Sequence, residues 1–182
     1  IVKRVMYHLA LPIGYKRLKL IEEKGGVNLF WRVLYRLANA VVFNPLKDKL
    51  GFSKTTFALM GGSPVSPDSF RFFQAIGLPM VQGYGSTETG TPLCIHHLRD
   101  VIFDTVGPPQ TEIELRVSDE GEILVRHPYL FKEYHKNPEK TQEAMSGGWY
   151  HTGDAGYITP EGHAVVMDRM EYLMELGGGE KF

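Results

Sequence analysis

A nine-residue stretch of small and polar residues, QGYGSTETG at 82–90, carries the first recognisable chemistry in this sequence. Glycines let a backbone approach a ligand closely, and a tyrosine ring can lie on a nucleobase. Hydroxyl groups donate to phosphate oxygens, whereas Glu88 beside a phosphate needs a cation between them. Mg²⁺ is commonly held by one carboxylate plus phosphates. The stretch therefore fits a phosphate site, and a plain loop is the alternative.

A helix start is a third interpretation of the same stretch, with Ser86 or Thr87 as the N-cap. A capping box needs Glu or Gln three residues after the cap. Those positions hold Thr89 and Gly90, so the box is absent and does not explain Glu88.

Further along the chain, Thr152-Gly153-Asp154 lies within GWYHTGDAGYI at 148–158. It reads either as a turn closed by the aspartate or as a site where Asp154 accepts hydrogen bonds from ribose hydroxyls. The seven histidines lack the spacing of a helical metal site, so we interpret them as surface or packing residues. Cys94, the single cysteine, excludes an intrachain disulfide and is interpreted as a small buried hydrophobe.

Charge is unevenly spread: residues 1–49 hold ten Lys and Arg against three Asp and Glu, although the net charge of the chain is -1. Apolar residues recur there at spacings of three and four, which predicts amphipathic helices. Such helices pack on the rest of a protein or lie on an anionic membrane surface. No apolar run is long enough to span a bilayer, and no signal-peptide pattern is present. The balanced charge argues against a nucleic-acid partner.

The elements that must position these residues change character along the chain. Residues 55–82 read as strand, turn, helix and strand, with Pro67 near the helix start and Gly77 at its end. This alternation predicts a partial α/β domain with a mostly parallel sheet over 1–108, whose ligands lie at the carboxyl ends of strands. The turns at 61–64 and 83–90 both follow strands and are expected to face one pocket.

A second pattern follows. Residues 109–167 alternate as two hairpins that turn at 119–121 and 160–162, which predicts a small antiparallel β subdomain. Residues 168–182 form a third part, too short to fold alone.

Five segments in order resemble the motifs of the adenylate-forming (AMP-binding) enzymes, most closely those of the long-chain fatty acid–CoA ligases. They are GGSP at 61–64, GYGSTETG at 83–90, GEILVRHPYLFKEYHKNPEKT at 121–141, GWYHTGD at 148–154 and DRMEYLMELGGGEKF at 168–182. The resemblance implies a ligase that activates a fatty acid with ATP to acyl-AMP and transfers the acyl group to CoA, with Mg²⁺. Its substrates would be a fatty acid, ATP and CoA, with no nucleic acid among its partners.

The resemblance also assigns roles to individual residues. Tyr84 would stack on adenine, Asp154 would bind the ribose hydroxyls, and Arg169 would reach ribose or phosphate. Thr87 and Glu88 would be catalytic, with Thr87 on the α-phosphate and Glu88 on Mg²⁺. The remaining nucleotide-binding positions would be Gly62, Ser63, Pro64, Gly83, Gly85 and Ser86. Asp168 would be the hinge of a mobile C-terminal domain that begins here, and Gly177, Gly178 and Gly179 would line the approach of CoA.

Some family features are absent from the sequence. Glu171 stands where the family has a basic residue, and Tyr172 stands where it has an acid. The upstream phosphate loop with its lysine and the C-terminal lysine are both missing. We therefore expect an internal fragment that cannot adenylate by itself. The alternatives are a non-catalytic acyl-AMP or nucleotide-binding module and an acyl-AMP ligase for a carrier protein. We expect a cytoplasmic protein and include membrane contact through 1–49 and a homodimer among its partners.

Overall fold

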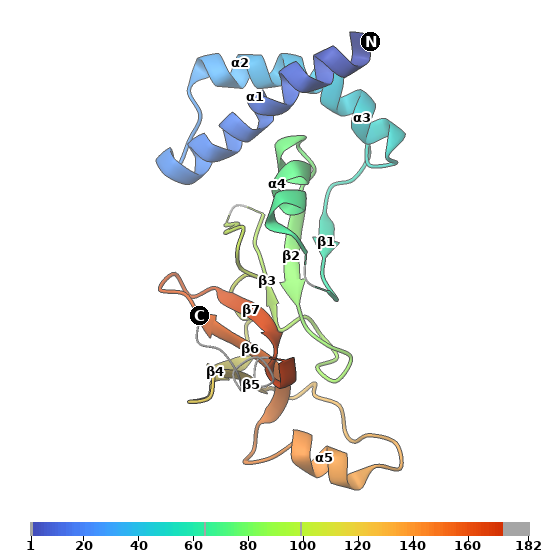
Figure 1. Cartoon of the computed structure of the whole chain (residues 1–182), viewed down its shortest axis with the longest axis vertical. Helices are drawn as coiled ribbons and strands as arrows, with labels where there is room; N and C mark the ends of the chain where they lie inside the picture. Colours follow the sequence, from blue (N-terminus) through green and yellow to red (C-terminus); the bar gives the residue numbers. More distant parts are fainter. Residues whose placement is uncertain (1, 64, 99, 173–182) are drawn as a thin grey trace. The chain divides into compact units, whose positions relative to one another are not determined.

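The computed structural model describes residues 2–63, 65–98 and 100–172 (Figure 1). The chain forms two compact units, residues 1–81 and 82–182. The domain boundaries expected at 108 and 167 stay predictions. The segment before 108 bonds within the second unit, where the Val106 N–H donates to Ala164 O at 2.8 Å.

The first unit begins with the helices expected over 1–49. They are α1 (Val2–Lys24), α2 (Leu29–Ala38), a π-helical turn η1 (Asn39–Phe43) and α3 (Asn44–Lys49). The N-cap of α2 is Asn28, whose Oδ1 accepts the Trp31 N–H at 3.1 Å. A core with Ala10, Phe43 and Ile76 at its centre joins these helices to α4 (Pro67–Ala75).

Helix α4 lies in sequence between strands β1 (Ala58–Met60) and β2 (Met80–Tyr84), as the pattern predicts. The arrows of β1 and β2 point the same way in Figure 1, as expected for a crossover through a helix. Strand β2 then pairs with β3 (Cys94–Ile95), and this pair is antiparallel. The short connection from β2 to β3 holds no helix to return the chain to the starting edge, which accounts for the antiparallel pairing here.

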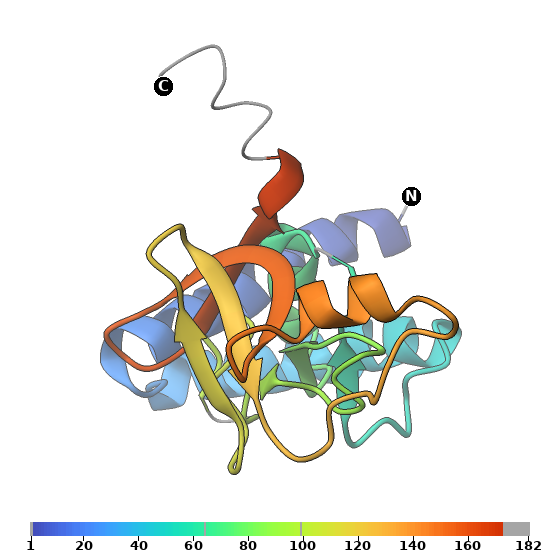
Figure 2. The ribbon, with the colours of Figure 1, turned by 90° about the horizontal axis from the view of Figure 1, so that it is seen from below.

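The second unit is built on a four-stranded antiparallel sheet, which confirms the small β subdomain. Its strands are ordered β4 (Glu114–Val117), β5 (Glu122–Arg126), β6 (Tyr150–Ile158) and β7 (Ala164–Arg169). Helix α5 (Pro138–Ala144) lies in the connection from β5 to β6 and contacts β6 (Figure 2). Gly121 and Gly162, with φ of +88° and +86°, occupy the two predicted hairpin turns.

Thr152-Gly153-Asp154 lies inside strand β6, so the turn interpretation of this motif is wrong. Glu122 of β5 pairs with Ala155, whereas Leu124, two residues on, pairs with His151. Between these two pairs β6 advances by four residues while β5 advances by two. The extra residues of β6 form a bulge at Gly153, whose φ is +69°. Bulges re-aim side chains, and this one precedes the carboxylate expected to bind ribose.

The core of the second unit is formed by side chains of the strands and of the segments that connect them. Its buried members are Leu93, Cys94, Val106, Ile123, Val125, Tyr150 and Ala164. Cys94 is fully buried, as the sequence predicts, and burial raises the pKa of its thiol to about 12. Across the described part of the chain, no helix is both long and apolar enough to cross a membrane.

Candidate functional site

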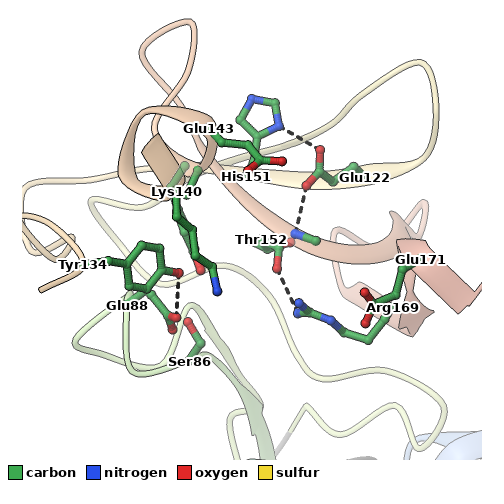
Figure 3. A pocket seen from close by; sticks show the side chains of 13 residues that line it. Ser86, Glu88, Glu122, Tyr134, Lys140, Glu143, His151, Thr152, Arg169 and Glu171 are labelled. Carbon is green, nitrogen blue, oxygen red and sulfur yellow. Dashed lines mark hydrogen bonds and ion pairs between the residues drawn. The ribbon is translucent and has the colours of Figure 1, made fainter. Parts of the chain in front are cut away.

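A cavity of about 530 Å³ opens in the second unit, between the loop after β2, helix α5 and strands β5 to β7 (Figure 3). It is lined by Ser86, Glu88, Glu122, Tyr134, Lys140, Glu143, Ala144, Tyr150, His151, Thr152, Gly153, Arg169 and Glu171. Two of the segments that carry family motifs, 83–90 and 148–154, therefore meet at one cavity.

Asp154 holds together the residues expected to bind the nucleoside. The Tyr84 hydroxyl donates to Asp154 Oδ2 at 2.5 Å, and Arg169 Nη1 donates to Asp154 Oδ1 at 2.9 Å. Arg169 Nη1 also donates to Thr152 O at 3.0 Å, and its side chain lines the cavity. Burial first, and then the hydrogen bond to Asp154, raise the pKa of Tyr84, so its hydroxyl stays protonated and donates.

Glu88 lies on another side of the cavity, in contact with Tyr134 (Figure 3). The Tyr134 hydroxyl donates to Glu88 Oε1 at 2.9 Å, and the Phe131 N–H donates to Glu88 O at 2.7 Å. Burial alone would raise the pKa of Glu88. The hydrogen bonds from its own backbone N–H and from Tyr134 outweigh burial and lower it, so Glu88 is a carboxylate at neutral pH.

Glu122 and His151 form a contact that sequence reasoning missed. Glu122 Oε2 lies 2.8 Å from His151 Nδ1, and Glu122 Oε1 accepts the Gly153 N–H at 2.8 Å. His151 Nε2 in turn lies 2.9 Å from Ser146 Oγ. One carboxylate thus holds both the imidazole and the β6 bulge. Both residues fall within motifs noted above, but their contact depends on a strand register that the sequence does not reveal.

Other predicted positions have mixed outcomes. Ser86 lines the cavity, whereas Thr87 is exposed and is not one of its lining residues. Gly83 is buried in β2, and a Cβ at Gly85 would lie 2.9 Å from Thr91 O, so a side chain there would collide with backbone. Asp168 is exposed at the end of β7.

The remaining positions cannot be compared with this cavity. Gly62 and Ser63 are exposed in the first unit. Pro64, Gly177, Gly178 and Gly179 lie outside the described residues, so their roles stay predictions.

The sequence profile of the AMP-binding enzyme family matches residues 20–135. This chain belongs to that family. A long-chain fatty-acid–CoA ligase of Mycobacterium bovis is 32% identical over 158 residues, covering 87% of this chain and 26% of that protein. A peroxisomal long-chain acyl-CoA synthetase of Arabidopsis thaliana is 36% identical over 196 residues, covering 99% and 26%.

The fold is also shared with solved members of the AMP-binding enzyme family. An o-succinylbenzoate coenzyme A synthetase of Bacillus subtilis, solved in complex with AMP, aligns with a TM-score of 0.58 and 27% identity. The alignment covers 63% of this chain and 26% of that one. The chain thus spans about a quarter of the length of the curated relatives described above.

Proposed function

We propose that this chain is part of an AMP-forming fatty acid–CoA ligase. In the first half-reaction a fatty-acid carboxylate attacks the α-phosphorus of ATP, and acyl-AMP forms as pyrophosphate leaves. In the second, the thiol of CoA attacks the acyl carbon, and AMP leaves as the thioester forms. The proposal is supported by family membership and by the names of the relatives. The observation that carries it is the Tyr84–Asp154–Arg169 cluster, of which Arg169 lines the cavity while Tyr84 and Asp154 do not.

That cluster suits a nucleoside monophosphate. Ribose hydroxyls would donate to the carboxylate of Asp154, which is already oriented by two donors. The ring of Tyr84 would stack on the base, and the guanidinium of Arg169 would face the phosphate. Each of these contacts would fix a part of the nucleotide. Rate acceleration at the α-phosphorus comes chiefly from positioning and charge neutralisation.

Mg²⁺ fits this cavity only as a companion of phosphate. Within the described residues, no group of three or more His, Cys, Asp or Glu side chains could hold a metal ion. A single carboxylate together with substrate phosphates is a common arrangement for Mg²⁺, and Glu88 lines the cavity as an ionised carboxylate. Glu88 would hold the ion, which would neutralise phosphate charge when bound.

The finer parts of the proposal rest on the family resemblance. They are Thr87 on the α-phosphate, Gly62, Ser63 and Pro64 beside the base, Asp168 as hinge, and Gly177, Gly178 and Gly179 on the path of CoA. A cytoplasmic protein, membrane contact through residues 1–49 and a homodimer belong to the same proposal. An acyl-AMP ligase for a carrier protein differs only in the acceptor thiol, and a binding module lacks both reaction steps.

Calorimetric titration of AMP into the 182-residue chain tests the nucleotide site. We expect Asp154→Asn to weaken AMP binding about tenfold, because a charge-assisted acceptor is lost. Asp119→Asn, on an exposed turn, is the matched control and should bind AMP as the unsubstituted chain does. Equal affinities for the two variants would contradict the assignment of Asp154.

The reaction itself is tested with the product of the whole gene. Fatty-acid-dependent exchange between ATP and pyrophosphate with long acids supports the ligase. A folded protein that exchanges with no acid would be a binding module instead.

A further inference from the structure

Glu122 is a largely buried carboxylate of the cavity to which the proposed function gives no role. Its side chain is 17% exposed, and it extends from the start of β5 towards β6 (Figure 3). Oε1 accepts the Gly153 N–H at 2.8 Å, and Oε2 lies 2.8 Å from His151 Nδ1. A carboxylate removed from water is costly unless its oxygens are hydrogen-bonded, and here both are. One side chain therefore holds the bulge of β6 to β5.

His151 fixes the direction of this carboxylate. An ionised carboxylate only accepts hydrogen bonds, so Nδ1 of the imidazole carries the hydrogen in the contact with Glu122. In the neutral ring Nε2 is then an acceptor, and it lies 2.9 Å from the hydroxyl of Ser146. The imidazole is thus held at both nitrogens. With Oε2 engaged by the imidazole, Oε1 is left facing Gly153.

The bulge at Gly153 lies between that carboxylate and the guanidinium of Arg169. A Cβ at Gly153 would lie 3.1 Å from Arg169 Nη2, so the guanidinium packs directly on the bulge. The preceding carbonyl, Thr152 O, accepts Arg169 Nη1 at 3.0 Å, and the Asp154 N–H donates to Thr152 Oγ1 at 3.0 Å. The position of the bulge therefore sets where both Asp154 and Arg169 lie.

We infer that Glu122 is a positioning residue that makes the candidate site selective for a ribose with free hydroxyl groups. The inference rests on the proposed function and deepens it. Glu122 holds the bulge, and the bulge holds the carboxylate of Asp154 where the ribose hydroxyls would donate to it. Hydrogen bonds weaken steeply when their geometry is lost, whereas stacking on Tyr84 depends on contact area and tolerates a small shift. Loss of Glu122 therefore impairs recognition of the hydroxyls and spares recognition of the base.

Calorimetric titrations with AMP and with its dideoxy analogue, which lacks both ribose hydroxyls, test this role in the 182-residue chain. We expect Glu122→Ala to weaken AMP binding about tenfold, since charge-assisted hydrogen bonds to the ribose are lost, and to change binding of the analogue less than about twofold. Glu122→Gln keeps an acceptor oxygen for the Gly153 N–H and should restore most of the AMP affinity. Glu120→Ala, at an exposed carboxylate of the same hairpin, is the matched control and should bind both nucleotides as the unsubstituted chain does.

Amide exchange measured by NMR follows the bulge directly. The Gly153 amide hydrogen, which is bonded to Glu122, should exchange with water at least about tenfold faster in Glu122→Ala than in Glu120→Ala. If Glu122→Ala fails to fold, His151→Ala carries the test, because it removes the partner of Oε2 and leaves Oε1 in place. We expect His151→Ala to weaken AMP binding severalfold and to spare the analogue.

The outcomes separate the role of Glu122 from the proposed function. Equal losses for AMP and the analogue would show a merely structural role and overturn the inference. A preference for AMP that survives in Glu122→Ala also overturns it and leaves the nucleotide site standing. An unsubstituted chain that binds both nucleotides equally contradicts the ribose role of Asp154. A chain that binds neither nucleotide overturns the proposed site and the inference together.

Discussion

Asp154 connects the residues of the candidate nucleoside site, because each of its carboxylate oxygens already accepts a hydrogen bond from one of them. Its two donors come from strands β2 and β7, far apart in sequence, and they fix the direction of both oxygens. A ligand hydroxyl therefore meets an oriented acceptor, and less conformational entropy is lost on binding. The sequence suggested a role for each of these three residues, but it gave no sign that they contact one another.

Comparing alanine substitutions at Gly153 and Gly148 separates an effect on the free energy of unfolding from an effect on AMP binding. The φ of Gly153 is +69°, and a Cβ there would lie 3.1 Å from Arg169 Nη2. Gly148 has a similar φ of +78°, and a Cβ there meets nothing within 4 Å. Gly153→Ala and Gly148→Ala should each lower the free energy of unfolding by about 1–2 kcal/mol, the cost of a left-handed alanine. Only Gly153→Ala should also displace Arg169 and weaken AMP binding severalfold.

Urea unfolding and AMP titration of the two variants check this prediction. If both alanine variants bound AMP equally well, the guanidinium of Arg169 would have no part in the site.

Among the elements, the β5–β6 pair shows how far the sequence could be used. Alternation and turn residues predicted both hairpins, because those signals are local. The sequence did not indicate that β6 starts at Tyr150 and carries a bulge, since a bulge depends on the register with β5. The contact of Glu122 with His151 and Gly153 depends on that register and was missed for the same reason.

A buried polar network connects the segment after β3 to the start of β7. His96 Nε2 lies 2.9 Å from Thr105 Oγ1, which lies 3.1 Å from His163 Nδ1, and His163 Nε2 lies 3.2 Å from Asp100 Oδ2. Both imidazoles are almost inaccessible to solvent, at 2% exposure each. A charged imidazole at position 96 would be poorly solvated, so the network favours the neutral form.

This network predicts a loss of stability in mild acid. Burial lowers the pKa of His96 to about 4, from 6.5 in an unfolded chain. Between these values the unfolded chain binds a proton that the folded chain does not. The contribution is therefore complete above pH 6.5 and is lost as the pH falls towards 4. It amounts to at most about 3–4 kcal/mol at 1.4 kcal/mol per pKa unit.

Urea unfolding between pH 7 and pH 5 measures this effect, and NMR titration should find the His96 ring neutral at pH 5. His135→Asn, at an exposed position, should keep the pH dependence of the unsubstituted chain. A His96→Asn variant with an undiminished dependence would assign the effect to other groups.

At the scale of the whole molecule, the first unit exposes an unusual apolar face. Sequence periodicity predicted amphipathic helices over 1–49, but it could not show which side of each helix faces the core. Helix α2 and η1 turn Ala38 and Phe43 inward. The outer stripe is Leu29, Phe30, Val33, Leu37 and Val41, of which Leu29 is 75% and Leu37 is 60% exposed. Arg32 and Arg36 are exposed on the same helix.

An apolar stripe accompanied by arginines predicts binding to an anionic lipid surface. The 182-residue chain should sediment with phosphatidylserine vesicles and much less with phosphatidylcholine vesicles. A Val33→Glu, Leu37→Glu double variant should reduce this binding at least about tenfold, because two exposed apolar side chains that would enter the lipid are replaced by carboxylates. Leu98→Glu, at an exposed leucine of the second unit, is the control and should bind normally. Binding that survives in the double variant would place the lipid contact elsewhere.

The rate at which a reagent labels the Cys94 thiol measures how often the core of the second unit opens. The thiol is unique in the chain, fully buried in the core, and has a raised pKa, so a disulfide reagent cannot reach a reactive thiolate while the core is closed. The rate of labelling at this one atom therefore counts openings of the core, without any engineered reporter. A nucleotide that binds only while the core is closed should slow labelling of Cys94. The size of that decrease would then give the affinity of the nucleotide.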